Sequence, residues 1–502
     1  MKRRSFLGCG ASALLGSQQP RATPSRPPNI LLIYADDLGY GDTGCYGATA
    51  VKTPNIDRLA RGGVRFTDAH SAASTCTPSR FSLLTGEYAF RTPEARILPG
   101  DAPALIRPGR PTLASMLQQQ GYRTGVVGKW HLGLGSGSID WNKEIRPGPL
   151  EIGFDESFII PATGDRVPCV YVENRRVANL DASDPITVSY QGPLDDGPTG
   201  KTHPQLLRVH PSHGHDNTIV NGISRIGFMR GGKSALWNDE TMADDLTERA
   251  TGYIGRNAKK PFFLYFATHD IHVPRVPNPR YSSATTMGPR GNAIAELDDC
   301  VGRILDALEK RGLLRDTLIL LSSDNGAVVN DGYQDQSIEK LGDHRPSGAL
   351  RSGKCSKFEG GTRVPFIAHW PARIKPSVSP ALIGQLDLFK SLATLTGAVL
   401  PAGAAPDSED VLPALLGESQ KGRRFLVEQS GGLGLRDGAW KYIEPSEGAA
   451  LITTTNIETG NSRQPQLYNL AADPAEQRNL ASAEPERLVA MTTKLHQIRK
   501  RE

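Results

Sequence analysis

Continuous apolar runs alternate with amphipathic stretches along most of the chain. The run Asn-Ile-Leu-Leu-Ile-Tyr-Ala at 29–35 is bounded by Pro28 and Asp36. A run that is apolar on both faces is typical of a strand covered on both sides. Similar runs predict strands at 122–127, 261–267, 317–321 and 364–370. Helical spacing or helix start and stop signals predict helices at 53–60, 111–120, 240–257 and 292–311.

This alternation favours an α/β fold with a large, mostly parallel sheet flanked by helices on both faces. We expect this α/β domain to occupy residues 29–415. Beyond that point the pattern changes to short strand-like runs at 425–428, 434–437, 440–443 and 466–469, followed by a helix at about 484–500. These elements predict a small C-terminal α+β subdomain over 416–502.

Polar residues follow directly after four of the buried runs. They are Asp36 and Asp37, Lys129 and His131, His272, and Asp324 and Asn325. In a parallel sheet the carboxyl ends of the strands share one edge, where ligands bind. We therefore expect these residues to converge. Three carboxylates and an amide are all oxygen donors, which suit a hard cation of the calcium type better than zinc.

Residues 134–235 show weak periodicity and many Gly, Pro and His residues, so we expect an elaborated, substrate-facing loop system. Four histidines fall there at spacings that match no metal-binding template: His203, His210, His213 and His215.

The formal charge of +5 is misleading, because five basic residues and no acids lie in the first 28 positions. The rest of the chain is neutral overall, so a general nucleic-acid-binding surface is not indicated. The first 28 residues predict an export signal and linker. Arg3-Arg4 resembles a twin-arginine pattern, and the apolar stretch after it is too short to span a bilayer. No other window approaches the length of a membrane span, and the protein is expected to be exported to the periplasm or beyond.

The segment Cys76-Thr-Pro-Ser-Arg-Phe-Ser-Leu-Leu-Thr-Gly86 carries the most specific signal. Pro78 favours a helix start, whose partial positive charge lowers a thiol pKa, and Arg80 adds a permanent charge. An isolated cysteine here would more often be a small buried core residue. A thiolate phosphatase would need its arginine at position 82, which is serine.

The motif Cys-x-Pro-Ser-Arg-x-x-Leu-Leu-Thr-Gly resembles the signature of the type I sulfatases of the alkaline phosphatase superfamily, whose cysteine becomes Cα-formylglycine. The resemblance extends to Gly128-Lys-Trp-His-Leu-Gly133, to His272-Val-Pro274 and to Lys354 five residues before Glu359-Gly-Gly. The motif Leu467-Tyr-Asn-Leu470 resembles one found in the antiparallel subdomain that closes sulfatases.

The resemblance implies a sulfuric ester hydrolase, with a sulfated carbohydrate as the expected substrate and a formylglycine-generating enzyme as partner. It implies that Asp36, Asp37, Asp324, Asn325 and the modified Cys76 bind Ca²⁺. Positive charge is expected from Arg80, Lys129 and Lys354. His131 is expected to act as a base, and His272 or Lys354 to protonate the leaving alcohol. The resemblance also suggests a further sulfate contact near Thr163, and a supporting role for His269.

Two alternatives stay open. A phosphodiester or phosphonate monoester hydrolase of the same superfamily can also use formylglycine. A sulfated-glycan binder without catalysis would result if Cys76 were never converted. The remaining cysteines, Cys45, Cys169, Cys300 and Cys355, can pair or stay free.

Overall fold

A computed structural model describes residues 26–500 of the chain. The export signal predicted at the N-terminus lies outside the described residues. Strand β1 (Asn29–Ala35) occupies the middle of a ten-stranded sheet, parallel to β12 (Phe262–Ala267) on one side and β13 (Thr317–Ser323) on the other. All residues of these three strands are buried, as their continuous apolar sequences predict.

The complete strand order is β15-β2-β14-β13-β1-β12-β4-β5-β6-β7. Only β14 and β6 run against the others, so the expected mostly parallel sheet is confirmed. The other strands are β2 (Val64–Phe66), β4 (Arg123–Lys129), β5 (Glu156–Ile160), β6 (Val172–Glu173), β7 (Arg176–Val177), β14 (Phe366–His369) and β15 (Ser377–Ser379).

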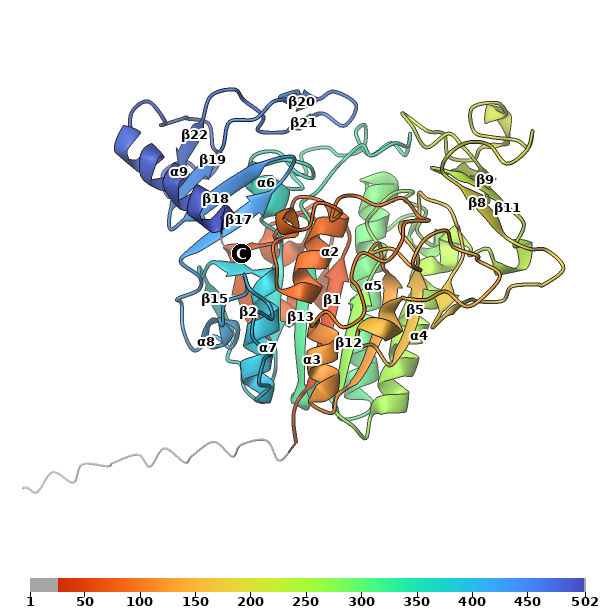
Figure 1. Cartoon of the computed structure of the whole chain (residues 1–502), viewed down its shortest axis with the longest axis horizontal. Helices are drawn as coiled ribbons and strands as arrows, with labels where there is room; N and C mark the ends of the chain where they lie inside the picture. The colour runs from red at the N-terminus through yellow and green to blue at the C-terminus, as the bar shows by residue number, and fades with distance from the viewer. Residues whose placement is uncertain (1–25, 501–502) are drawn as a thin grey trace, which may run out of the picture.

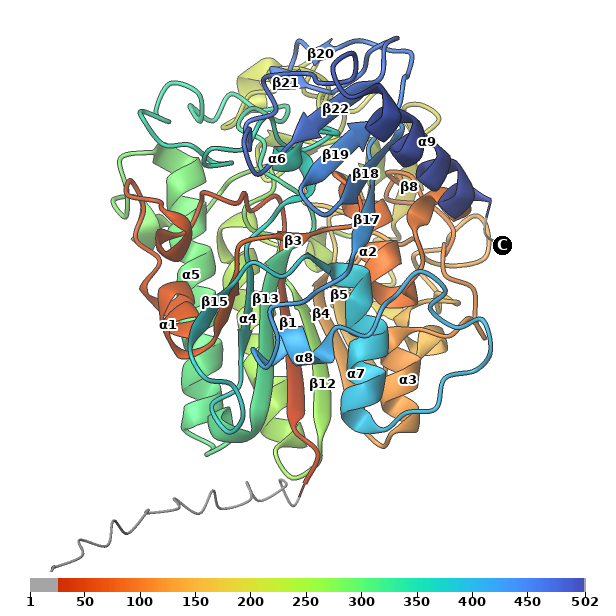
Figure 2. The same cartoon turned by 90° about the vertical axis from the view of Figure 1, so that its left-hand side faces the viewer.

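Helices cover both faces of the sheet (Figure 2). One layer contains α1 (Pro54–Gly62), α4 (Met242–Asn257) and α5 (Gly288–Glu309). The other contains α2 (Cys76–Thr85), α3 (Leu113–Gln119) and α7 (Leu388–Thr396). Within residues 26–500, no helix combines the length and apolar character needed to cross a membrane.

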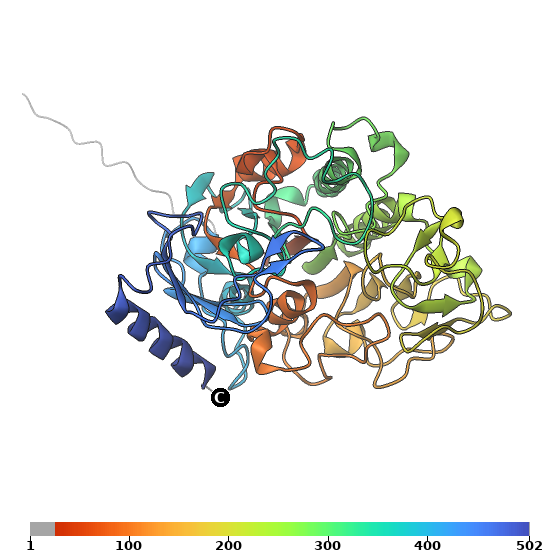
Figure 3. The ribbon, with the colours of Figure 1, turned by 90° about the horizontal axis from the view of Figure 1, so that it is seen from above.

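The C-terminal sheet is antiparallel and is closed by α9 (Pro485–Arg499) (Figure 1). Its strands are β17 (Phe425–Gln429), β18 (Leu433–Asp437), β19 (Trp440–Ile443) and β22 (Gln466–Asn469). Seen from above, it lies at the opposite end of the molecule from the 165–235 region (Figure 3).

A buried network of charges joins this sheet to the large domain. The Lys441 Nζ lies 2.9 Å from Glu359 Oε1, 2.8 Å from Glu428 Oε2 and 3.6 Å from Glu476 Oε1. All four side chains are buried, and Glu359 begins α6 (Glu359–Thr362), which follows Lys354 closely in the chain. His70 Nδ1 lies 2.9 Å from Glu428 Oε1. The charges therefore balance one another inside the protein rather than in solvent.

The 134–235 region differs from its expected loop structure in one respect. It supplies β5, β6 and β7 to the large sheet, and β5 pairs in parallel with β4. The rest consists of turns, short 3-10 helices and two small strand pairs: β8 (Thr187–Ser189) with β11 (Phe228–Arg230), and β9 (Ile219–Val220) with β10 (Ile223–Ser224). The sequence analysis missed β5 because it is only five residues long and no helical pattern follows it.

Candidate functional site

The carboxyl ends of four neighbouring parallel strands meet at one edge of the large sheet. These strands are β13, β1, β12 and β4, and they lead into Asp324, Asp36, His272 and Lys129 respectively. One carboxylate oxygen from each of Asp36, Asp37 and Asp324 lies within 4.8 Å of the others. The structure therefore brings together residues nearly 290 positions apart, as the shared edge of a parallel sheet requires.

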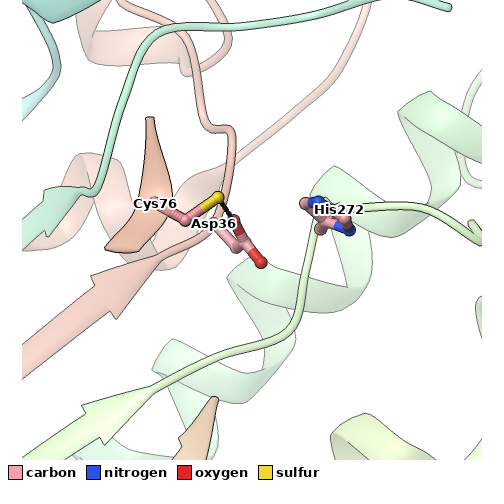
Figure 4. A group of neighbouring side chains, drawn as sticks. All are labelled: Asp36, Cys76 and His272. Carbon is pink, nitrogen blue, oxygen red and sulfur yellow. Dashed lines mark hydrogen bonds between the residues drawn. The ribbon is translucent and has the colours of Figure 1, made fainter. Parts of the chain in front are cut away.

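Helix α2, which belongs to the same helix layer as α3 and α7, brings Cys76 to this edge of the sheet. Cys76 is its first residue, and the Sγ lies 4.0 Å from Asp36 Oδ1 (Figure 4). Burial raises the pKa of the Cys76 thiol to about 12, although Lys129 opposes this effect. The sequence-based expectation of a lowered thiol pKa at the helix start is therefore wrong, because burial outweighs the helix end. The remaining cysteines of the described part are also free thiols: Cys45, Cys169, Cys300 and Cys355.

Three basic side chains balance the three carboxylates. Lys129 Nζ lies 2.5 Å from Asp36 Oδ2, and Lys354 Nζ lies 2.8 Å from Asp37 Oδ2. Arg80 donates from Nε (3.0 Å) and Nη2 (2.8 Å) to Asp324 Oδ2. Burial tends to raise the pKa of Asp324, but Arg80 and Lys129 hold it below its usual value. Burial and the neighbouring charge of Asp324 instead raise the pKa of Asp36, despite Lys129.

The oxygen donors of this edge fit a hard cation. Asn325 donates from Nδ2 to Asp37 Oδ1 at 2.7 Å, while its buried Oδ1 has no hydrogen-bond partner among the described residues. An unpaired buried carbonyl oxygen is costly, and a cation would satisfy it. The donor set of three carboxylates and one amide oxygen suits Ca²⁺.

His131 follows Lys129 beyond the end of β4. Its backbone has a φ of 52°, so the alternation of side chains along the strand ends before it. His131 Nε2 lies 2.9 Å from the Leu98 carbonyl oxygen, which can only accept, so Nε2 carries the proton. The buried Nδ1 has no partner among the described residues. Burial, and then the charge of Lys129, hold the pKa of His131 well below its usual value. Nδ1 is thus available as a proton acceptor.

His272 and Lys354 reach the same carboxylate from different loops. His272 Nε2 lies 3.9 Å from Asp37 Oδ2, and its Nδ1 lies 2.7 Å from the Val273 carbonyl oxygen. Figure 4 shows the His272 ring across the site from Cys76 and Asp36. His269, by contrast, packs against Gly164.

The structure also distinguishes Lys354 from Lys357, the other lysine of the same loop. Lys354 Nζ bonds both Asp37 and Asp331, at 2.8 Å each. Lys357 Nζ instead bonds Ser446 Oγ and Asn461 Oδ1 in the C-terminal part of the chain. Asp331 is a polar neighbour of the site that the sequence analysis missed, since it lies in a loop without a recognisable motif.

Thr163 and the four histidines of the 134–235 region have different surroundings. Thr163 donates its hydroxyl hydrogen to Asp165, and His215 Nε2 lies 2.9 Å from the other oxygen of Asp165. His203 bonds the neighbouring Thr202 side chain instead. Only His215 of the four therefore makes a described side-chain contact with Asp165.

Comparisons with family models and with known proteins show what the chain is similar to. The family model described as "Sulfatase" matches residues 28–398. The chain is 50% identical to the N-acetylgalactosamine-6-O-sulfatase of Bacteroides thetaiotaomicron, over 96% of this chain and 95% of that protein. It is 35% identical to arylsulfatase A of Homo sapiens, over 97% of this chain and 90% of the human protein.

A solved structure from work on glycosaminoglycan metabolism by Bacteroides thetaiotaomicron has the same fold. The two superpose with a TM-score of 0.94 at 50% sequence identity. The match covers 95% of this chain and 100% of the other. The large sheet, its flanking helices and the C-terminal sheet are thus shared over nearly the full length.

Proposed function

Because the chain belongs to the sulfatase family and is a sulfuric ester hydrolase, we propose that it removes the 6-O-sulfate of N-acetylgalactosamine in a sulfated glycan. The observation that carries this proposal is the 50% identity, over almost the whole of both chains, to an N-acetylgalactosamine-6-O-sulfatase. The matched stretch spans the strand ends and loops that line the candidate site.

The residues present fit the two groups that sulfatases use. Asp36, Asp37, Asp324 and Asn325 would hold Ca²⁺, which would polarise the sulfate when bound. Cys76 would be converted by a formylglycine-generating enzyme, and the hydrated aldehyde would supply the nucleophile. The pKa of about 12 for the unmodified thiol supports this requirement, because little thiolate exists at neutral pH.

The chain's own side chains supply charge and proton transfer. Lys129 and Lys354 place ammonium groups beside the carboxylates, where negative charge develops during sulfate-ester cleavage. Arg80 holds Asp324 in position and contributes further positive charge. His131 accepts a proton at Nδ1, because the Leu98 carbonyl keeps the proton of the neutral ring on Nε2.

The departing alcohol needs a proton. His272 can provide it from Nε2 only after the ring takes up a proton, because the Val273 carbonyl occupies Nδ1–H and because burial, followed by the charge of Lys354, holds the pKa of the ring well below its usual value. Lys354 is the second proton donor near the same position. An alkoxide is a poor leaving group, so this transfer matters most for sugar sulfates.

The assay is sulfate release from N-acetylgalactosamine 6-sulfate by protein produced together with a formylglycine-generating enzyme. We expect the highest kcat/KM on this sugar, with lower values on the 4-sulfate and on a phosphonate monoester. Preference for the phosphonate would contradict the proposal. Mass spectrometry of the Cys76 peptide gives an independent test. An aldehyde at position 76 supports formylglycine as the nucleophile, whereas an unmodified thiol in an active preparation contradicts this assignment.

We also propose export to the periplasm or beyond through the twin-arginine-like N-terminus. Replacing Arg3 and Arg4 together by lysine should retain the protein in the cytoplasm. Unchanged export of this variant in cell fractionation would contradict the signal type.

A further inference from the structure

Strand β5 ends at the same sheet edge as the strands that supply the candidate site, yet the proposed mechanism uses no residue beyond its end. β5 is parallel to β4, with Ile160 opposite Lys129. The backbone N–H of His131 donates to the Pro161 carbonyl oxygen at 3.1 Å. The turn that follows β5 therefore lies directly beside Lys129 and His131.

A buried carboxylate fixes this turn. Asp165 is 2% exposed, and it accepts hydrogen bonds from the Thr163 hydroxyl and from Arg166 Nη1, the latter at 2.9 Å. His215, fifty positions later, lies against the other Asp165 oxygen at 2.9 Å. The His215 ring packs on Tyr333, with 4.9 Å between ring centroids. Three loops thus hold the carboxylate that positions Arg166.

The outer edge of the Arg166 guanidinium is free. Nη1 bonds Asp165 and Thr163, whereas no hydrogen bond from Nε or Nη2 is found within residues 26–500. The side chain is 17% exposed. Its charge also contributes to the low pKa of His131, after burial and Lys129. Arg166 is therefore a partly buried cation, anchored on one side and open on the other, beside the reacting edge. A guanidinium in that setting suits a pair of oxygen acceptors.

We propose that Arg166 determines specificity by donating hydrogen bonds from Nε and Nη2 to the sugar oxygens next to the sulfate-bearing carbon, with Asp165 and His215 as its positioning residues. This inference rests on the proposed function. In a hexose 6-sulfate, the C4 hydroxyl and the ring oxygen are the oxygens nearest to C6. The C4 hydroxyl is axial in galactosamine and equatorial in glucosamine, so a fixed donor beside C4 distinguishes the two sugars.

The test compares Arg166→Ala and Arg166→Lys with the matched control Arg175→Ala. Arg175 also bonds a carboxylate, that of Glu151. It lies in the turn between β6 and β7, which is beside the amino end of β5 and so away from the candidate site. Each protein is assayed on the 6-sulfates of N-acetylgalactosamine and N-acetylglucosamine and on an aryl sulfate that lacks the sugar. For Arg166→Ala we expect the ratio of kcat/KM for N-acetylgalactosamine 6-sulfate to that for the aryl sulfate to fall about 10- to 100-fold, as for lost hydrogen bonds to a charged group. The preference for galacto over gluco should fall with it.

Arg166→Lys should recover only part of that ratio, because a single ammonium cannot bond two oxygens as the fork does. His215→Ala should lower the same ratio by a smaller factor, mainly through KM, and His215→Gln, which keeps a donor for Asp165, should lower it less. If His215 had only a structural role, its variants would lower the activities on the sugar sulfate and on the aryl sulfate by the same factor.

An unchanged ratio of kcat/KM for the sugar sulfate to that for the aryl sulfate in Arg166→Ala would overturn the inference, whether or not both activities fall. Failure of the proposed function is recognised separately, in the unmutated protein, as preference for another sulfated sugar. The Arg166 ratio is then measured on that preferred sugar, with the same criteria.

Discussion

Replacing Lys441 with methionine removes an ammonium group that three buried carboxylates share. The change keeps much of the side-chain volume, so its main effect is electrostatic. Burial tends to raise the pKa of Glu428, but Lys441 overcomes this and holds it at about 2. Burial already raises the pKa of Glu476 to about 7 despite Lys441. Without Lys441, we expect Glu476 to hold a proton at pH 7 and Glu428 to take up a second proton in the folded protein.

The cost follows from that proton uptake. The ordinary pKa of a glutamate is 4.5, and protonating such a group at pH 7 costs about 3.4 kcal/mol, at about 1.36 kcal/mol per pH unit. Breaking a buried ion pair typically costs about 3–5 kcal/mol, which is consistent. We therefore expect Lys441→Met to lower the free energy of unfolding by about 3–4 kcal/mol at pH 7.

The pH dependence has a definite sign. In the variant, the folded-state pKa of Glu428 lies above the unfolded value, so the penalty falls as the pH falls. At pH 5.5 the same proton uptake costs about 1.4 kcal/mol. In the unmutated protein the low pKa of Glu428 stabilises the fold above pH 4.5, and this contribution is lost only as the pH falls toward about 2.

The assay is urea unfolding followed by tryptophan fluorescence at pH 7 and pH 5.5. Lys494→Met is the matched control, because Lys494 Nζ makes a 2.8 Å pair with Asp437 and is 24% exposed. We expect that control to cost less than about 1 kcal/mol. The double variant Lys441→Met/Glu428→Gln should recover part of the lost stability. A deficit for Lys441→Met that matches the control, or that is as large at pH 5.5 as at pH 7, would refute the reasoning.

Four further outcomes test the candidate site. Cys76→Ala should abolish turnover while changing the melting temperature by only a few degrees; equal loss of stability and activity would indicate a core residue instead. Calcium at a hundred times its dissociation constant should stabilise the protein by about 2.7 kcal/mol, and Asp324→Asn should weaken this shift; better recovery of a chelated sample with zinc than with calcium would contradict the assignment. His131→Ala should release one equivalent of alcohol from a good substrate and then stop, whereas continued turnover would exclude its role as the base. His272→Ala should slow sugar sulfates far more than activated aryl sulfates; equal slowing would exclude its role toward the leaving group.

The sheet and the convergence at its edge were predictable from the sequence because they depend on local pattern. Strands β1, β12 and β13 are buried on both faces, so the sequence of each is a largely apolar run followed by polar residues. The choice of Lys354 over Lys357, in contrast, needed the family resemblance, since both lysines occupy the same loop.

Contacts between distant loops could not be predicted in this way. The pairing of His215 with Asp165 joins positions fifty residues apart, and no sequence period marks it. The Leu98 carbonyl that orients His131 belongs to an irregular segment. The pKa of Cys76 was misjudged for a related reason: the start of a helix can be recognised locally, but the depth of its burial depends on the whole fold.

The central position of β1 also determines when, during synthesis of the chain, the middle of the sheet can form. Its neighbours β12 and β13 are completed only with Ala267 and Ser323, so the middle of the sheet cannot form until about 250 residues after Cys76 have been made. At roughly 5–20 residues per second, that delay is about 12–50 seconds. Cys76 is almost inaccessible once the chain is folded, at 3% exposure. A modifying enzyme therefore has this interval, prolonged by any delay in folding, to reach the cysteine while it is still part of an open chain.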